Sequence, residues 1–312
     1  MAYLRAFGRY LPERIVDNAE LASLVGVEPE WIVQASGIAQ RRYAAPDETV
    51  AGMGAKAAQD CLRAAGVDVR DVGLLIAASG SGELRFPGPA AAIGTALGIG
   101  GVPAIDLPMA SAGSLFGIAL AARLCDHYRN VLVLGSEIMS RLVRLDPAGR
   151  DTAILFGDGA GACLLSAECG FARVADSLLS SDGEFGRELR LELEGPIQME
   201  GRTIIMQASR KIPRAIGELL QRNGIQAGDV EAFLIHQANL NLVLRVAAAL
   251  RVPESRFYRN VARYGNTSSA SMLIAAAEWW TERGGAPIEA PAVFAAFGAG
   301  LHWGAALALP AR

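Results

Sequence analysis

Two side chains in this sequence have the types and positions to stabilise negative charge on an oxygen. His236 lies in FLIHQANLNL, at the end of an apolar strand and just before a helix, where a parallel sheet presents side chains at its carboxyl edge. Asn266 lies in YGNTSSAS, after a glycine turn and before a helix of small residues. Alone, each has a structural explanation, as a hydrogen-bonded core histidine or a helix N-cap. Together they could donate hydrogen bonds to a developing oxyanion.

Ser111, in DLPMASAGSLFG, is the candidate nucleophile because it begins the helix expected at residues 111–125. A helix dipole alone does not ionise a hydroxyl, so Ser111 needs a general base within hydrogen-bond reach. His236 is the first candidate for that base and His302 the second.

The cysteines offer no alternative nucleophile or metal site. Cys125 lies about four turns along the same helix, and the four thiols contain no C-x-x-C pair with nearby histidines. We therefore expect reduced thiols in a cytosolic protein and no metal. The four cysteines are Cys61, Cys125, Cys163 and Cys169.

Short apolar runs alternate with longer segments of helical period, which is typical of helices packed on a buried, mostly parallel sheet. The expected strands are residues 72–78, 131–134, 233–235 and 293–297. The expected helices are residues 50–65, 111–125, 208–221, 240–250 and 269–280.

The two halves of the chain share a weak internal repeat. AAGVDVRDVGLLIA aligns with RNGIQAGDVEAFLI from Gly66 to Gly224, an offset of 158 residues. The same offset aligns Ser111 with Ser269, each near the start of a small-residue helix. The repeat predicts two related halves, residues 1–166 and 167–312, packed face to face.

Composition excludes several classes of protein. Of the 312 residues, 52% are hydrophobic and 20% charged, which allows a large core. With 29 Lys+Arg against 32 Asp+Glu and no basic run, we do not expect a nucleic-acid partner. The uncharged residues 86–105 and 290–311 are interrupted by glycine or proline, so we expect no membrane insertion. No signal-peptide pattern begins the chain, which indicates a cytoplasmic protein.

Four separated motifs together resemble those of one enzyme family. They are FGDGAGA at residues 156–162, HQANL at 236–240, YGNTSSAS at 264–271 and FGAGLHWG at 297–304. Their order and spacing, from PEWIV at residue 29 to the C-terminus, are similar to those of β-ketoacyl-acyl-carrier-protein synthase III in the thiolase superfamily. The resemblance implies a duplicated five-layered α/β/α/β/α sandwich with mostly parallel sheets, which usually forms a homodimer.

The resemblance also implies what the motif residues do. His236 and Asn266 would bind a thioester carbonyl and stabilise the enolate formed when a malonyl group decarboxylates. Gly298 and Gly300 would belong to a glycine loop whose backbone N–H helps to bind a second oxyanion.

Substrate contacts follow from the same comparison. Trp31 and Arg150 match positions that hold coenzyme A, and Phe86 matches one that lines the acyl pocket of the partner subunit, although a core position would explain Phe86 equally well. The implied substrates are thioesters of coenzyme A or of an acyl-carrier protein, with no bound cofactor.

The sequence departs from the family pattern at the nucleophile, where Ser111 replaces cysteine. An ester on Ser111 is a poorer electrophile than a thioester, which favours acyl transfer to an oxygen, nitrogen or sulfur acceptor over Claisen condensation. Relatives with serine here occur among polyketide-priming proteins, so both a natural variant and a laboratory replacement are compatible with the sequence.

Two further departures concern the substrate contacts. Asn241, Ala248 and Ala249 stand where carrier-protein-dependent relatives tend to have basic residues, although Arg245 and Arg251 could form a rearranged basic patch. Ala35 stands where relatives often place an arginine near the coenzyme.

We therefore expect a synthase III-like acyltransferase or condensing enzyme of fatty acid or polyketide-type biosynthesis. The alternatives are a decarboxylase that does not condense, a pseudoenzyme partner subunit of the same fold, and a serine-based thioester hydrolase. The hydrolase ranks lower because Met109 breaks the G-x-S-x-G pattern. A dehydrogenase ranks lowest because GDGAG at residues 157–161 lacks the spacing of a dinucleotide fingerprint.

Overall fold

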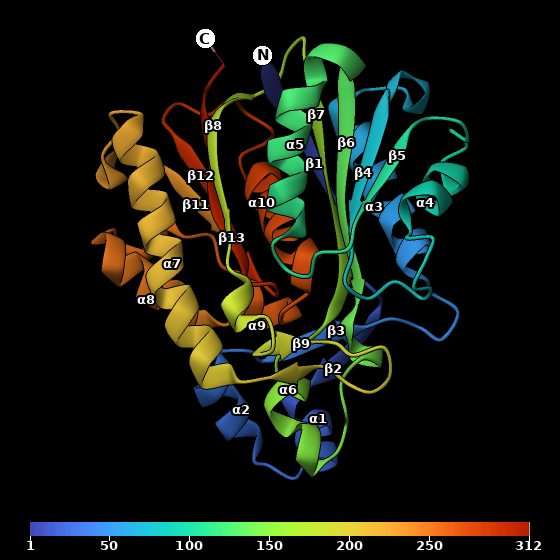
Figure 1. The fold of residues 1–312 in the computed structure, drawn as a ribbon, viewed down its shortest axis with the longest axis vertical. Coiled ribbons are helices and arrows are strands. Elements are labelled where there is room, and N and C mark those ends of the chain that lie inside the picture. The colour runs from blue at the N-terminus through green and yellow to red at the C-terminus, as the bar shows by residue number, and fades with distance from the viewer. Residues whose placement is uncertain (312) are drawn as a thin grey trace.

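The apolar runs of the sequence form the strands of one nine-stranded sheet (Figure 1). The computed structural model describes residues 1–311 and orders the strands β11-β12-β13-β8-β1-β7-β6-β4-β5. Their bounds are β1 (Ala2–Tyr10), β4 (Leu74–Ala78), β5 (Ala104–Leu107), β6 (Asn130–Ile138), β7 (Asp158–Ser166), β8 (Ala172–Ser181), β11 (Ala232–Ile235), β12 (Ala292–Gly298) and β13 (His302–Pro310). Two small sheets pair β2 (Arg14–Asp17) with β3 (Gln40–Tyr43) and β9 (Leu189–Arg190) with β10 (Gln198–Met199).

The prediction of mostly parallel sheets is wrong. Within the nine-stranded sheet, β4·β5, β4·β6 and β11·β12 are parallel, and the other neighbouring pairs are antiparallel. One reason lies in the connections: residues 299–301 alone join β12 to β13, which is too short for the crossover that a parallel pair needs. The chain therefore has a mixed α/β fold.

Helices pack against the nine-stranded sheet, and two of them contact strands across most of its width. Helices α5 (Gly113–Tyr128) and α10 (Ser271–Glu282) each contact strands on both sides of β1 in the strand order, so they lie near the middle of the sheet (Figure 1). Helix α3 (Val50–Ala65) covers β1, β6 and β7. On the other side, α7 (Gly201–Arg222) covers β12 and β13 and packs on α8 (Leu240–Leu250).

The shorter helices have glycine ends or lie at the rim of the molecule. Helices α1 and α2 both end at a left-handed glycine, and with α6 they lie at the lower end in Figure 1. Their bounds are α1 (Asn18–Val25), α2 (Pro29–Ser36), α4 (Ala90–Ala96), α6 (Arg150–Ala153) and α9 (Val261–Tyr264). Among residues 1–311, no helix has the length and apolar character needed to cross a bilayer.

The internal repeat aligns matching elements. At the offset of 158 residues, the 3₁₀ helix η1 (Val69–Asp71) corresponds to η5 (Ala227–Asp229), and strand β4 corresponds to β11. In both places, the last turns of a long helix precede the repeat.

Two expected helices begin later than the sequence predicts, and both delays occur at serines. The helix expected from residue 111 begins at Gly113, because Ser111 adopts a left-handed backbone with φ 61°. The helix expected from residue 269 begins at Ser271, after the 3₁₀ helix η7 (Ser268–Ala270) in which Ser268 has φ 48°.

A glycine in β6 lets this second start approach the sheet. A Cβ atom added at Gly135 would lie 2.4 Å from the carbonyl oxygen of Ser269. Contact this close is possible only without a side chain. Gly135 therefore determines how near residues 266–271, called the 266–271 segment below, can lie to β6.

Gly135→Ala tests this constraint. We expect it to lower the free energy of unfolding by about 1–3 kcal/mol because the sheet and the segment must move apart. Gly217→Ala, in helix α7 with nothing within 4 Å of the added atom, is the matched control and should leave stability unchanged or raise it by about 1 kcal/mol. Urea unfolding of both variants makes the comparison, and equal effects would contradict it.

Candidate active site

Ser111 lies at the start of α5 and is held there by Ser268. Its backbone N–H donates to the Ser268 hydroxyl at 2.9 Å, and the two hydroxyl oxygens are 3.5 Å apart. Both serines are buried, and both have positive φ, a conformation that costs a residue with a side chain about 1–3 kcal/mol. Such strain persists only where the surroundings hold it, and it concentrates at functional sites.

The glycine loop closes over Ser111 from β12. A Cβ atom at Gly298 would lie 2.3 Å from the carbonyl oxygen of Ala110 and 3.0 Å from the Cβ of Ser111. A Cβ atom at Gly300, where φ is 135°, would lie 2.2 Å from the Cδ2 atom of the His302 ring. The structure therefore places the two predicted glycines differently, with Gly298 against Ser111 and Gly300 against His302.

Asn266 and His236 are each held through one polar atom of the side chain. The Asn266 Oδ1 accepts a hydrogen bond from the backbone N–H of Ser268 at 2.9 Å, and the His236 Nδ1 lies 2.5 Å from the Ser271 hydroxyl. Within residues 1–311, the Asn266 Nδ2 and the His236 Nε2 form no hydrogen bond. Each side chain thus keeps one nitrogen for another molecule, and the His236 Nε2 is a donor in the tautomer whose Nδ1 accepts from the Ser271 hydroxyl.

Burial determines the charge of His236. The side chain is only 5% exposed, and desolvation lowers its pKa from 6.5 to about 4. His236 is therefore neutral near pH 7 and can donate a hydrogen bond while remaining a weak base.

The predicted bases for Ser111 are not at its hydroxyl. Among the described residues, neither His236 nor His302 forms a hydrogen bond with Ser111, and Ser268 is the neighbour within reach. The His302 Nδ1 instead lies 2.7 Å from the Ser181 hydroxyl.

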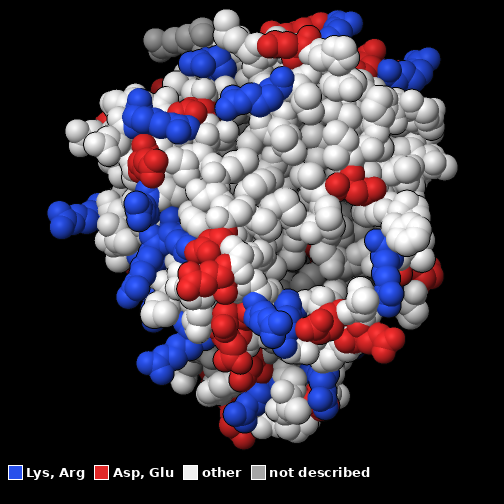
Figure 2. All heavy atoms as spheres, in the orientation of Figure 1, with Lys and Arg blue, Asp and Glu red and all other residues white. Residues whose placement is uncertain are grey.

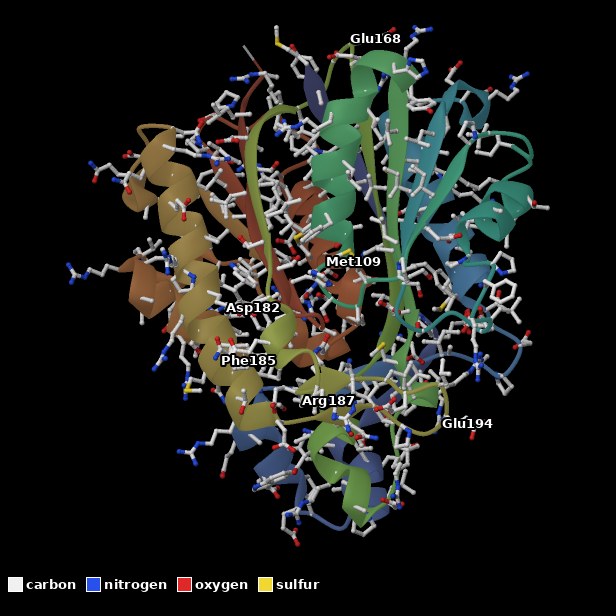
Figure 3. The ribbon with its side chains drawn as sticks, viewed as in Figure 1. Met109, Glu168, Asp182, Phe185, Arg187 and Glu194 are labelled. Carbon is white, nitrogen blue, oxygen red and sulfur yellow. The ribbon has the colours of Figure 1, made fainter. Side chains whose placement is uncertain are left out.

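Two neighbouring hollows lie at and beside Ser111, and they share part of their lining. The smaller is an apolar pocket at Ser111 itself, lined by Met139, Phe156, Leu189, Leu191 and Ile197 among others. The larger cavity, of about 650 Å³, is lined by Met109 and His302, and both hollows reach Ala110 and Ala299. Figure 3 shows Met109 above the segment that runs from Asp182 and Phe185 to Glu194.

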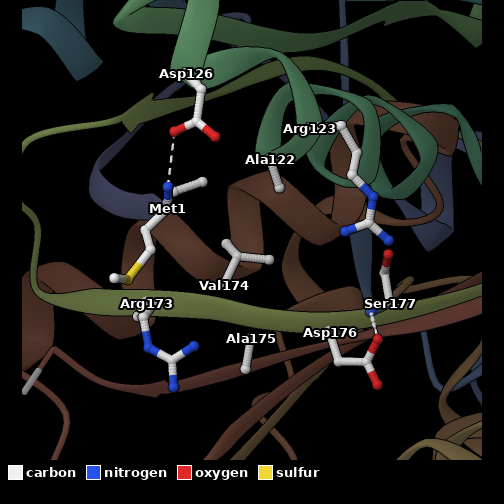
Figure 4. Close-up of a pocket in the computed structure, with 10 residues that line it drawn as sticks. Met1, Ala122, Arg123, Asp126, Arg173, Val174, Ala175, Asp176 and Ser177 are labelled. Carbon is white, nitrogen blue, oxygen red and sulfur yellow. Dashed lines mark hydrogen bonds and ion pairs between the residues drawn. The ribbon is translucent and has the colours of Figure 1, made fainter.

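A third hollow, of about 300 Å³, lies near the N-terminus (Figure 4). Its acidic groups are already paired, since the α-amino group of Met1 binds Asp126 at 2.7 Å and Asp176 accepts from Arg222 at 2.5 Å. It contains none of the predicted site residues.

The remaining predicted residues lie at the rim. Trp31 on α2 is 38% exposed, and Arg150 begins α6; the two helices share a hydrophobic cluster that contains Ile32 and Ile154. Phe86 is 86% exposed in the single chain, so the alternative of a core position is wrong.

Two features of the site are not among the residues predicted from the sequence. Glu137, in the otherwise apolar strand β6, is fully buried, and its carboxyl accepts hydrogen bonds from Ser81 and Ser269. A charged residue inside the run NVLVLGSEI was the available signal. Asn241 donates to the carbonyls of Gln34 and Ala35, so this departure from the family pattern ties α8 to the end of α2.

Family models match both parts of the chain. The model described as 3-oxoacyl-[acyl-carrier-protein (ACP)] synthase III matches residues 105–183, which include Ser111 and Glu137. The model for the C-terminal part of the same synthase matches residues 220–309, which include His236 and Asn266.

Curated relatives extend this similarity over nearly the whole length. The β-ketoacyl-[acyl-carrier-protein] synthase III of Oleidesulfovibrio alaskensis is 36% identical over 326 aligned positions, covering 98% of each chain. A synthase III of Vibrio vulnificus is also 36% identical, covering 96% of each chain.

Solved structures agree with the sequence comparison. The 3-oxoacyl-[acyl-carrier-protein] synthase III of Aquifex aeolicus superposes with a TM-score of 0.94 at 30% identity, covering 99% of this chain and 100% of the other. The priming β-ketosynthase of a polyketide biosynthetic pathway superposes with a TM-score of 0.90 at 31% identity, covering 100% and 96%. The chain belongs to the β-ketoacyl-acyl-carrier-protein synthase III family, a family of acyltransferases of fatty acid and polyketide biosynthesis.

Proposed function

We propose that Ser111 receives an acyl group from a coenzyme A or acyl-carrier-protein thioester and holds it as an oxyester. The observation that carries this proposal is the strained, buried position of Ser111 under Gly298, with its hydroxyl beside an apolar pocket. The pocket suits an acyl chain, and a backbone N–H of the glycine loop beside Ser111 would stabilise the oxyanion that forms when Ser111 attacks.

His236 and Asn266 would act on the second substrate. Their free donors, Nε2 and Nδ2, can bind the carbonyl of a malonyl thioester and stabilise the enolate that forms on loss of carbon dioxide. A neutral histidine suits this role because it donates without needing to be protonated.

Two fates of the acyl group remain distinct in this scheme. Attack by the enolate on the Ser111 ester gives a β-keto product, and attack by an oxygen, nitrogen or sulfur acceptor gives simple acyl transfer. The ester favours the second fate because it is less electrophilic than a thioester. Decarboxylation without condensation is the alternative supported by the two free donors.

Surface features fit the proposed substrates. Trp31 lies on α2 and Arg150 on α6, two helices that contribute to one hydrophobic cluster, and from there both side chains could hold coenzyme A. For a carrier protein, which is acidic, exposed arginines on α7, on α8 and directly after α8 offer a docking surface. Figure 2 shows basic side chains on the side where α7 lies. These arginines are Arg202, Arg210, Arg214, Arg245 and Arg251.

A homodimer would complete the site. Strand β5 is the edge of the sheet and pairs only with β4 in the described chain, with Ile105 39% exposed. Nearby, Leu84 and Phe86 are 64% and 86% exposed. A second copy paired along β5 would bury these side chains and would allow Phe86 to line the acyl pocket of its partner.

We also propose the division into related halves, residues 1–166 and 167–312, in a duplicated five-layered sandwich. Its support is the matching order of elements at the 158-residue offset and the two helices, α5 and α10, that contact strands on both sides of β1.

Incubation with acyl-coenzyme A of several chain lengths should add one acyl mass to the protein at Ser111, detected by intact-protein and peptide mass spectrometry. Ser111→Ala should abolish the label, whereas Ser114→Ala, one turn further along α5, should keep it. A label on a cysteine, or one that survives Ser111→Ala, would sink the assignment.

The pH dependence of stability tests the buried neutral state of His236. Its pKa is about 4 in the folded protein against an ordinary value of 6.5, so its stabilisation is complete above pH 6.5 and is lost as the pH falls towards 4. Relative to His236→Asn, the native protein should lose about 3 kcal/mol of unfolding free energy between pH 7 and pH 4. Urea unfolding checks this, with the exposed His127→Asn as control; a constant difference would refute it.

Ile105→Lys should convert the dimer to a monomer because it places charge at the edge of β5. Light scattering after gel filtration should show twice the chain mass of 32.7 kDa for the native protein and one chain mass for the variant. Leu24→Lys, on a similarly exposed side chain of α1, should remain dimeric. A native protein that is monomeric would contradict the proposed dimer.

A further inference from the structure

Lys211, on α7, is a partly buried cation that the proposed mechanism does not use. It and Lys56 are the only two lysines of the chain, whose 29 Lys+Arg residues are otherwise arginines. Its side chain is 19% exposed, and its ammonium nitrogen lies 2.8 Å from the carboxylate of Asp182 and 4.0 Å from the ring centre of Trp303. A cation largely shielded from water is attracted more strongly to a carboxylate and to an aromatic face than an exposed one.

Asp182 links this cation to the glycine loop, residues 298–301. The Asp182 N–H donates to the carbonyl oxygen of Leu301 at 2.9 Å, and the Leu301 N–H donates to the Asp182 carbonyl oxygen at 2.8 Å. These two bonds extend the antiparallel pairing of β8 with β13 into the loop. The Asp182 side chain is fixed at both oxygens, Oδ2 by Lys211 and Oδ1 by the Glu184 N–H at 3.1 Å. The position of Asp182 therefore sets the position of one end of the loop.

Trp303 gives Lys211 a second contact beside the same loop. It follows the loop on β13 and pairs with Phe297, the residue that precedes the loop on β12. The ring of Phe185, three residues after Asp182, lies 5.7 Å from the same ammonium nitrogen. Figure 3 shows Asp182 and Phe185 beside α7. Lys211 therefore holds Asp182 against the start of β13, where the glycine loop ends.

The other end of the glycine loop lies against the nucleophile. A Cβ atom at Gly298 would lie 3.0 Å from the Cβ of Ser111, so a shift of the loop changes its distance from Ser111. A donor must lie about 2.7–3.1 Å from the oxygen on which negative charge develops. A misplacement of about 1 Å can slow a reaction about 100-fold.

We propose that Lys211 is a positioning residue for acyl transfer: through Asp182 and Trp303 it holds the glycine loop where a backbone N–H can stabilise the oxyanion formed at Ser111. This inference rests on the proposed acylation of Ser111. In that step the Ser111 oxygen bonds to the thioester carbon, the C–S bond breaks, and the hydroxyl proton leaves with the thiol. Lys211 acts on this step through the loop and touches none of the reacting atoms.

His236 and Asn266 are held by other contacts. The His236 ring is bonded to the Ser271 hydroxyl, and the Asn266 side chain accepts from the Ser268 N–H. Loss of Lys211 should therefore slow the acylation of Ser111 and leave the decarboxylation of a malonyl thioester at the two donors unchanged. A general loss of structure would slow both reactions.

The test measures the single-turnover rate of acylation over a range of concentrations of an acyl-coenzyme A that labels the native protein. Lys211→Met keeps most of the side chain's length and removes its charge. It should lower the maximal rate about 10- to 100-fold and change the half-saturating concentration by less than about threefold. Lys211→Arg keeps a cation for the carboxylate and the ring, so it should stay within about fivefold of the native maximal rate.

Lys56→Met is the matched control. The ammonium nitrogen of Lys56, on α3, lies 4.1 Å from the ring centre of Tyr10 and 3.3 Å from the carboxylate of Glu48, so Lys56 makes the same two kinds of contact as Lys211. Neither of its partners lines the hollows at and beside Ser111. Lys56→Met should therefore leave the acylation rate unchanged.

Decarboxylation of malonyl-coenzyme A by the same variants separates positioning from loss of structure. Release of carbon dioxide by Lys211→Met and by Lys56→Met should proceed at the native rate. Equal losses of acylation and decarboxylation in Lys211→Met would show a structural role and overturn the inference.

The acylation data distinguish the two proposals. If native Ser111 is acylated and Lys211→Met reacts at the native rate, the positioning role is wrong and the proposed function stands. A raised half-saturating concentration at an unchanged maximal rate also overturns the role, because Lys211 would then bind the thioester itself. If native Ser111 is never acylated, the proposed function fails and this inference fails with it.

Discussion

The hydrogen bond from the Ser111 N–H to the Ser268 hydroxyl is the contact on which the arrangement of this site depends. It joins two segments that come from different halves of the chain, and both partners have left-handed backbones that cost free energy. Such backbones persist because glycines let the surroundings close in. Gly298 packs on Ser111, and Gly135 lets the 266–271 segment reach β6.

The same segment organises the rest of the site. Asn266 begins it and accepts from the Ser268 N–H, and Ser271 ends it at the ring of His236. Ser111 and the two proposed carbonyl donors, His236 and Asn266, are therefore all fixed to six consecutive residues. This common anchor sets the direction of each free donor and suits a reaction in which two carbonyl groups must be held in turn.

The structure also separates two chemical tasks that the sequence had assigned to one histidine. Burial keeps His236 neutral, which suits a hydrogen-bond donor, and leaves it without a contact to the Ser111 hydroxyl. The Ser111 hydroxyl instead lies 3.5 Å from the hydroxyl of Ser268. A serine nucleophile needs a nearby proton acceptor more than a cysteine does, because a hydroxyl ionises far less readily than a thiol.

The sequence predicted the helices whose bounds depend on the residues nearby in the chain. The helices at residues 50–65 and 240–250 have their expected bounds, and HQANL and YGNTSSAS are the motifs from which His236 and Asn266 are proposed as site residues. The direction of most strands could not be predicted, because it depends on pairings between distant parts of the sequence. Strand β1, at the N-terminus, lies between β7 and β8 and is antiparallel to both. Glu137 escaped notice because the hydroxyls that bind it come from Ser79, Ser81 and Ser269, which only the folded chain brings together. A crystal structure of the protein after incubation with acyl-coenzyme A tests the central claim most directly. We predict an ester on the Ser111 oxygen with the Ser268 hydroxyl beside it. An acyl group on another residue, or a Ser268 hydroxyl turned away from Ser111, would contradict the account.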